Sequence, residues 1–302
     1  MTMEEQKSAQ ILSGFVIKVM AMIFMTLDHI GAFLMFNVQE SPLYTTGYVF
    51  RAIGRIAFPL FAFLMVEGFR YTRSPLKYFL RIAIFFVSIA LVETIYIYAV
   101  PGNRYLAYQR IENAFADLLI IAGFFYCLSL KSWRKVFLII PVAVVGLSFG
   151  VYLYENAHSM NILWWPTYLR PGYSLLGLAI ALGFYLARPL SKLASSQYLT
   201  AIGQDYASYE DTPPHRKLVN ILSSLIFFVI VLAFWGASYI GAGEGNRPYD
   251  PLQMSFESYC LLAIIPILLY SGKRGYDAKW FRVFSYLYYP VHMLLLILIF
   301  GL

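Results

Sequence analysis

Charged residues are scarce in this chain of 302 residues: 13% are charged, whereas 60% are hydrophobic. The mean hydropathy is +0.65. Because soluble globular domains carry roughly 25% charged residues, the composition excludes the ordinary soluble class. The net charge of +7 alone would permit nucleic-acid binding, but the basic residues alternate between loops, as the positive-inside rule requires of a membrane protein. No nucleic-acid partner is therefore expected.

Cysteine is also rare, and Cys127 and Cys260 both fall in apolar runs. A cysteine there packs as a small hydrophobic residue, so redox chemistry gains no support. The chain lacks a glycine-rich phosphate loop, a CxxC pair and an HExxH motif, and no metal is expected. Since we find no repeat, no low-complexity tract and no soluble domain, we expect residues 1–302 to form a single integral membrane domain.

Long apolar runs, in contrast, are abundant. A transmembrane helix needs roughly 20 mainly apolar residues, and nine runs reach or approach that length. They lie at about 14–37, 50–69, 79–100, 113–130, 135–154, 173–188, 218–241, 254–271 and 281–301. The fold class is therefore predicted to be all-α: a polytopic helical membrane protein with about nine transmembrane helices.

The first apolar run is not expected to be a cleaved signal peptide. It is too long, it contains Lys18, Asp28 and His29, and it ends without a small-residue cleavage site. We therefore expect it to remain in the mature protein as the first membrane span.

Lysine and arginine mark alternate connections between the runs. They are concentrated at about 70–81, 131–135, 188–217 and 273–282, and they are sparse in the intervening connections. Nine spans with the N-terminus inside and the C-terminus outside satisfy the positive-inside rule at every loop. We expect a multi-pass protein of a bacterial inner or plasma membrane, surrounded by membrane lipid.

Polar side chains lie in the middle of several runs, beginning with the adjacent Asp28 and His29. A charged side chain near the bilayer centre costs at least a few kcal/mol and is kept mainly where function needs it. Counting about 1.5 Å per residue from the helix centres places ionisable or amide groups from five predicted helices in one layer, between the midplane and the outer surface. The members are Asp28, His29, Arg51, Arg55, Glu93, Asn113, Asp117 and His292. Because their exposure to lipid would be prohibitive, we expect them to face one another across a polar cavity.

Neighbouring helix positions point about 100° apart, so Asp28 and His29 do not orient each other. We expect Asp28 to pair with Arg51 or Arg55, whose guanidinium holds a carboxylate in a bidentate fork. Asp28 is then a structural anchor and His29 the reactive group. The reverse assignment, with Asp28 as the reactive partner, stays open.

If His29 needs a carboxylate to fix its tautomer, the candidates are Glu93 and Asp117. Two simpler interpretations also stay open: His292 only bonds a backbone carbonyl, and Arg51 only extends its guanidinium to the membrane interface.

Two further groups are candidate binding sites. The first lies at the predicted cytoplasmic end of the second helix and consists of Glu67, Arg70, Arg73, Lys77 and Arg81. These residues suit the phosphates of an anionic cytosolic donor, although the positive-inside rule alone also calls for basic residues there. The second is the predicted outer loop with Trp164 and Trp165, interpreted either as an interfacial aromatic belt or as a platform for the acceptor.

Four segments carry a family resemblance: MIFMTLDHIGAFL, RAIGRIAFPLFAFLMVEGFRYTRSPLKYFLR, ENAFADLLI and YLYYPVHMLLL. They resemble the TraX family of integral membrane proteins, whose namesake N-acetylates the pilin subunit of F-type pili. The likeness covers the first 130 residues and the last 20, whereas residues 131–280 match little. The family motif covers Asp28, His29, Arg51, Gly54, Arg55, Pro59, Glu67, Gly68, Arg70, Tyr78, Arg81, Asn113 and His292; Asp117 is not part of it.

The resemblance implies acyl transfer, most simply from acetyl-CoA to an amine or hydroxyl at the outer side of the membrane. The acceptor would be an exported protein N-terminus or an envelope glycan. More distantly, the chain is similar to membrane acyltransferases in which an embedded histidine passes or positions the acyl group. Histidine is the side chain best suited to act as a base near neutral pH, so we expect His29 to be the base, with Arg55 or Asn113 stabilising the oxyanion. An acyl-histidine intermediate is the variant mechanism.

Two other functions stay open. A proton-coupled permease would also place carboxylates and histidines near the midplane, but nine spans do not divide into equal halves and we find no paired broken helices in the sequence. A non-catalytic assembly factor would use the polar layer only to hold helices together. Loss of acyl transfer in a folded His29→Ala protein would argue against both.

Overall fold

The computed structural model describes residues 10–37, 42–99, 113–158, 162, 164–166, 169–240 and 254–300. Within these ranges the regular structure is helical and no β-strand occurs; Leu12 and Tyr270 form an isolated bridge. The elements are α1 (Gly14–Asn37), α2 (Pro42–Gly54), α3 (Ala57–Tyr71), α4 (Pro75–Ala99), α6 (Ala114–Ser129), η1 (Ser132–Leu138), α7 (Ile139–His158), α8 (Ser174–Ala201), α9 (Tyr206–Tyr209), α10 (Pro213–Ile240), α11 (Met254–Glu257), η3 (Ser258–Ala263), α12 (Ile264–Leu268) and α13 (Lys279–Phe300).

The helices confirm that the chain is a multi-pass helical membrane protein. In the described part, six stretches are long and apolar enough to cross a membrane: Gly14–Met35, Pro42–Tyr71, Ser132–Glu155, Ser174–Ala201, Pro213–Ser238 and Lys279–Phe300. Shorter apolar helices, Ala114–Ser129 and Ser258–Leu268, occupy the fourth and eighth predicted runs, and α4 occupies the third. A total of nine spans and the orientation in the membrane stay predictions.

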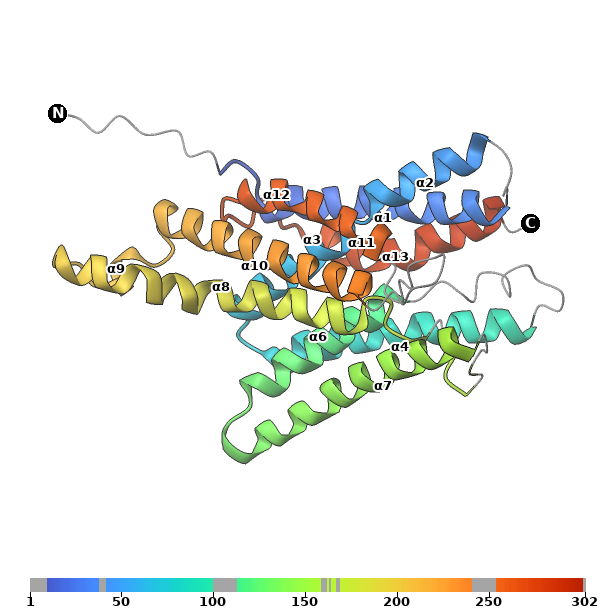
Figure 1. The fold of residues 1–302 in the computed structure, drawn as a ribbon, viewed down its shortest axis with the longest axis horizontal. Coiled ribbons are helices and arrows are strands. Elements are labelled where there is room, and N and C mark those ends of the chain that lie inside the picture. The colour runs from blue at the N-terminus through green and yellow to red at the C-terminus, as the bar shows by residue number, and fades with distance from the viewer. Residues whose placement is uncertain are drawn as a thin grey trace.

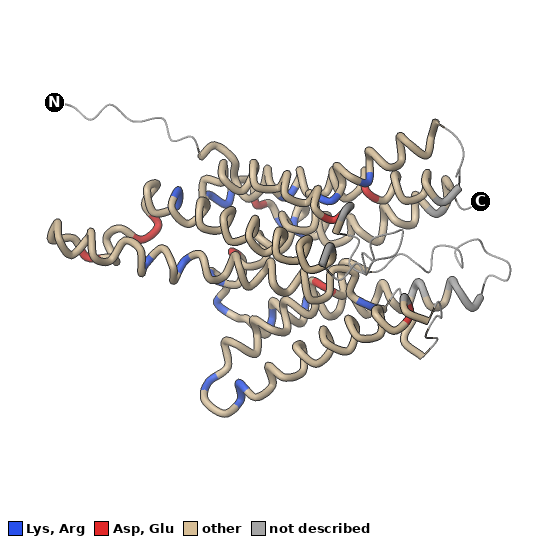
Figure 2. The backbone as a smooth tube through the Cα atoms, viewed as in Figure 1, with Lys and Arg blue, Asp and Glu red and all other residues tan. Residues whose placement is uncertain are grey.

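The helices run roughly along one axis (Figure 1). α1 packs closely against α2, α8 against α10, and α4 against α6. Among the residues that Figure 2 colours by charge, lysines and arginines lie mostly in the half of the molecule that holds α9, and fewer lie in the opposite half. Arg104, Arg110 and Arg247, in the predicted outer connections, lie outside the described residues.

Two predicted membrane helices are interrupted. The second begins at Pro42 rather than near residue 50, and it breaks between α2 and α3, where Arg55 and Ile56 form a turn. The eighth is divided into α11, η3 and α12. The two interruptions are neighbours, because η3 packs against α2 and α3. At the break between α2 and α3 the backbone N–H groups of Arg55 and Ile56 still donate to the carbonyl oxygens of Arg51 and Ile53, so these groups are satisfied within the segment.

Glycines allow α1 and α2 to approach closely. A Cβ added to Gly31 would lie 2.5 Å from the carbonyl oxygen of Gly47, and one added to Gly54 would lie 2.5 Å from Cα of Asp28. Small residues of this kind let membrane helices pack backbone to backbone. The close crossing brings Asp28 of α1 next to the break that follows Gly54.

Candidate active site

A cavity of about 1390 Å³ lies among α1, α3, α4, α6, α7 and α13. Basic side chains line one end, here called the basic mouth: Lys18, Arg73, Arg81, Arg274 and Arg282. They are exposed or half-buried, so the cavity meets the surface there. Charged side chains line the other end, here called the inner cluster: Asp28, His29, Arg51, Arg55 and Glu257. On α1, Lys18 and His29 are separated by roughly 16 Å along the helix axis.

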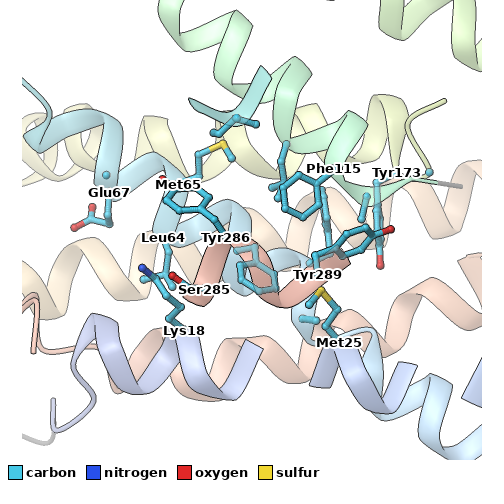
Figure 3. A pocket seen from close by; sticks show the side chains of 18 of the residues that line it. Lys18, Met25, Leu64, Met65, Glu67, Phe115, Tyr173, Ser285, Tyr286 and Tyr289 are labelled. Atoms are coloured by element: carbon cyan, nitrogen blue, oxygen red, sulfur yellow. The ribbon is translucent and has the colours of Figure 1, made fainter. Parts of the chain in front are cut away.

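The middle of the cavity is apolar and aromatic. Figure 3 shows Met65, Phe115, Tyr286 and Tyr289 between Lys18 at one side and Tyr173 at the other. The basic mouth and the inner cluster are therefore separated by a stretch of rings and thioethers, which a ligand that reaches both must pass.

Arg55 is the centre of the inner cluster. Its Nε donates to Oδ1 of Asp28 at 3.0 Å, its Nη2 contacts Oδ2 of the same carboxylate, and its Nη1 donates to Oε1 of Glu257 at 2.8 Å. Arg51 lies farther away, with Nη1 3.7 Å from Oδ2 of Asp28. Buried ion pairs of this kind are stable only when hydrogen bonds satisfy both partners. The fork geometry does so for Arg55 and Asp28, whereas Oε2 of Glu257 is buried with no hydrogen-bond partner among the described residues. The predicted role of Asp28 as an anchor for Arg51 or Arg55 is confirmed as a contact.

His29 meets another histidine rather than a carboxylate. Its Nδ1 lies 2.7 Å from Nε2 of His292, and Nδ1 of His292 lies 2.8 Å from the carbonyl oxygen of Tyr288. Both imidazoles are buried, but only His29 lines the cavity. The expectation that Asp117 orients His29 is wrong, because His292 occupies that position; the side chain of Glu93 lies outside the described residues.

Asp117 and Asn113 cap helices. Asp117 accepts hydrogen bonds from the backbone N–H groups of Gly172, Tyr173 and Ser174 at 2.7, 3.1 and 2.7 Å, which anchors the start of α8. Asn113 accepts from N–H of Phe115 at 2.9 Å as the N-cap of α6. Neither side chain lines the cavity. Their depth in the membrane predicted that they belong with the inner cluster, but their contacts lie elsewhere.

A comparison with protein families shows which family the chain belongs to. The model of the family described as TraX protein matches residues 13–300. The chain belongs to the TraX family. The match includes residues 131–280, which showed little resemblance by eye. No curated protein and no solved structure matches the chain.

The predicted donor residues of this TraX-family chain divide into two groups. Arg73 and Arg81 line the basic mouth, whereas Arg70 and Lys77 do not line the cavity. Arg70 donates instead to Glu67 at 2.9 Å and to the carbonyl oxygens of Phe184 and Tyr185. It therefore joins α3 to α8, and Lys77 is exposed.

Glu67 belongs to a buried ion-pair network at the same end of the bundle. Its Oε2 accepts from Arg216 of α10 at 2.7 Å, and Arg216 and Arg188 both contact Asp211 in the loop before α10. Partial burial raises the pKa of Asp211, but the Arg188 guanidinium and the hydrogen bonds from Tyr71 and Arg188 outweigh it, so the net pKa lies below its ordinary value. The network ties α3, α8 and α10 together.

The outer aromatic pair does not reach the cavity. Trp164 is 70% exposed, and neither it nor Trp165 lines the cavity wall. The loop is held by Arg170, which binds Glu155 through two hydrogen bonds of 2.6 and 3.0 Å and donates to the carbonyl oxygen of Trp165. Both members of this ion pair line the cavity.

Several cavity residues were not predicted from the sequence. Glu257 lies inside the eighth predicted run, so its position within an apolar segment was a usable signal. Lys18, Arg274 and Arg282 had only the signal of their positive charge near predicted helix ends, which the positive-inside rule also explains. No group of three or more His, Cys, Asp or Glu residues suited to a metal occurs in the described ranges.

Residues 146–150 read GLSFG and match the GxSxG pattern of α/β-hydrolases. In those enzymes the serine sits on a sharp strand-to-helix turn. Here Ser148 lies within α7 and lines the cavity. The pattern therefore does not form a nucleophile elbow.

Proposed function

We propose that this chain is an integral membrane acyltransferase. It moves an acetyl group from acetyl-CoA to an amine or hydroxyl on an exported protein N-terminus or an envelope glycan, in a bacterial inner membrane. The observation that carries the proposal is the single cavity, which joins an exposed basic mouth to a buried histidine and its charged neighbours.

The basic mouth suits the donor. Phosphate groups bind best to arginine and lysine. Asp277 pairs with Arg274 at 2.9 Å and with Arg282 at 3.1 Å, but its negative charge is smaller than the summed positive charge of the basic mouth. The long pantetheine arm of coenzyme A would cross the aromatic middle of the cavity and place the thioester near His29. The mouth lies at the end of the bundle that the charge pattern assigns to the cytoplasm, where acetyl-CoA is available.

The inner cluster supplies the chemistry of direct transfer. The acceptor nitrogen or oxygen attacks the thioester carbonyl carbon while His29 takes its proton. The C–S bond then breaks, and the proton passes to the leaving sulfur. Arg51 is the better partner for the oxyanion. Carboxylates already engage Nε, Nη1 and Nη2 of Arg55, whereas Arg51 makes only a longer ion pair with Asp28, at 3.7 Å, beside its contact with the ring of Phe256.

Label transfer in detergent-purified protein tests the proposal. Wild type and His29→Ala are incubated with radiolabelled acetyl-CoA and membrane extract as the acceptor source. His158→Ala is the matched control, because His158 is an exposed histidine at the end of α7. Transfer by wild type and His158→Ala but not by folded His29→Ala supports the proposal, and absence of donor binding and turnover in all three contradicts it. Label that stays on protein denatured rapidly at neutral pH, where an acyl-imidazole survives longer than in acid, distinguishes an acyl-histidine intermediate from direct transfer.

A proton-coupled permease is the second candidate, favoured by the neighbouring interruptions of the second and eighth helices. Broken helices that meet near the membrane midplane are typical of transporters. A permease would accumulate a substrate in proteoliposomes in response to a pH gradient without any acetyl-CoA. Transport that survives in the absence of the thioester would favour this candidate.

A further inference from the structure

We propose that His292 is a positioning residue that fixes the tautomer of His29 and receives a proton from it during turnover. The inference rests on the proposed acyltransferase function for its chemical consequence. Its structural part, the direction of the proton between the two rings, stands on contacts alone.

The contacts of His292 determine which nitrogens carry hydrogen. A carbonyl oxygen only accepts hydrogen bonds, so the 2.8 Å contact to Tyr288 O requires a hydrogen on Nδ1 of His292. In a neutral His292 the Nε2 atom is therefore the acceptor. The 2.7 Å contact then requires a hydrogen on Nδ1 of His29. The neutral pair leaves the lone pair of His29 on Nε2, which is the form that a general base needs.

The surroundings of the pair hold this geometry. The two rings lie 5.0 Å apart with planes inclined by 19°, and Tyr289 presents an edge to each. Tyr288 stacks on His292, and its hydroxyl lies 2.7 Å from that of Thr26 on α1. The second contact ties α13 to α1 one turn before His29, so the two imidazoles are held on helices that are themselves linked.

The charged groups near the pair lie on the side of His29. Asp28 precedes it in sequence, and Arg51 and Arg55 converge on Asp28 from α2 and the following turn. The hydroxyl-bearing Tyr288 and Tyr289 face the pair from α13, and the side chain of Glu93 on α4 lies outside the described residues. The two guanidinium groups are matched by the carboxylates of Asp28 and Glu257, so this side carries no net formal charge. The direction of proton transfer therefore rests on the hydrogen bond between the two rings.

The proton steps balance without another reactant. The acceptor gives a proton to Nε2 of His29, and the proton on Nδ1 of His29 moves to Nε2 of His292. His29 is then neutral with hydrogen on Nε2, and His292 carries the charge. When the C–S bond breaks, Nε2 of His29 gives its hydrogen to the leaving sulfur, and His292 returns a proton to Nδ1 of His29. Both rings end as they began.

The His292→Gln variant separates the relay from a purely positioning role. The side-chain oxygen of Gln accepts the hydrogen bond from His29 and keeps its tautomer, but it does not take up the proton. We expect kcat to fall roughly 100-fold, within the range typical of general acid–base catalysis, with KM for acetyl-CoA unchanged. His158→Gln is the matched control and should match wild type. Retention of kcat within about threefold in folded His292→Gln would overturn the relay.

Two further measurements guard against a variant that simply repositions His29. A plot of the rate against the D₂O fraction should curve for wild type, because two protons move, and become linear for His292→Gln. A linear plot for wild type contradicts the relay.

Nitrogen-15 NMR of histidine-labelled protein, with His29→Ala and His292→Gln used for assignment, should show hydrogen on Nδ1 and none on Nε2 of resting His29. The opposite tautomer would refute the pair geometry even in inactive protein. The expected tautomer without any acyl transfer would instead leave the pair standing and refute the proposed function.

Discussion

The crossing of α1 and α2 gives a sharp prediction for Gly54→Ala. The added Cβ would lie 2.5 Å from Cα and 2.7 Å from N of Asp28, against 3.4–4 Å for ordinary contact. Since backbone atoms are the obstacle, the two helices must separate by roughly 1 Å, and overpacking of this kind costs about 3 kcal/mol. The same shift would lengthen the 3.0 Å bond between Arg55 Nε and Asp28 Oδ1 beyond hydrogen-bonding range. Stability and catalysis should therefore fall together.

Thermal unfolding in detergent, followed by size-exclusion chromatography of heated samples, checks this prediction. We expect the midpoint of Gly54→Ala to fall by roughly 5–10 °C. Gly150→Ala is the matched control, because a Cβ on that α7 residue meets nothing within 4 Å; the change should be neutral or stabilise the helix by up to about 1 kcal/mol. Equal midpoints for Gly54→Ala and wild type would refute the close-crossing argument.

Three further predictions concern other parts of the molecule. The double change Arg274→Ala/Arg282→Ala should raise KM for acetyl-CoA roughly tenfold or more with little effect on kcat. The control Arg134→Ala/Lys135→Ala changes exposed residues of η1 away from the cavity and should change neither constant. Equal effects of the two double changes would contradict donor binding at the basic mouth. Asp117→Ala should destabilise the fold by about 2–4 kcal/mol, because the N–H groups at the start of α8 lose their acceptor, and Asp117→Ala that unfolds like wild type would contradict the capping role. The folded-state pKa of Asp211 lies below its ordinary value, so its ion pairs stabilise the fold above the unfolded pKa of about 3.9 and lose that contribution as the pH falls through the folded pKa. Asp211→Asn should therefore lower the unfolding midpoint slightly at neutral pH and not in acid. A difference that does not change with pH would contradict this prediction.

Helix rise alone predicted which polar side chains meet, even though Arg55 lies in the turn after α2 and His292 does not line the cavity. Asp28, His29, Arg51, Arg55 and His292 were placed in one layer by helix rise alone, and the structure brings them together. Helix rise did not predict the partners of Asp117 and Asn113, because the depth of a residue does not give the direction of its side chain. Each of these side chains accepts hydrogen bonds from the free backbone N–H groups at a helix start.

The carboxylate partner of Arg55 shows a different limit. Glu257 was visible within an apolar run, but its relation to Arg55 depends on two helix interruptions that meet through η3. Hydropathy averages over such interruptions, because a broken helix and a continuous one have the same composition. The identity of the partner was therefore a property of packing.

The sequence by itself determined that this protein is a multi-pass helical membrane protein of the TraX family, because long apolar runs, alternating basic loops and a local motif are all written along the chain. The tertiary structure alone decided that His29 bonds His292 across 263 positions. It also decided that Arg70 joins α3 to α8 while Lys18 and Arg274 line the basic mouth, and that one cavity joins the basic mouth to the inner cluster. These facts depend on which faces of distant helices meet, and the close packing that selects those faces arises from many contacts at once rather than from any one stretch of sequence.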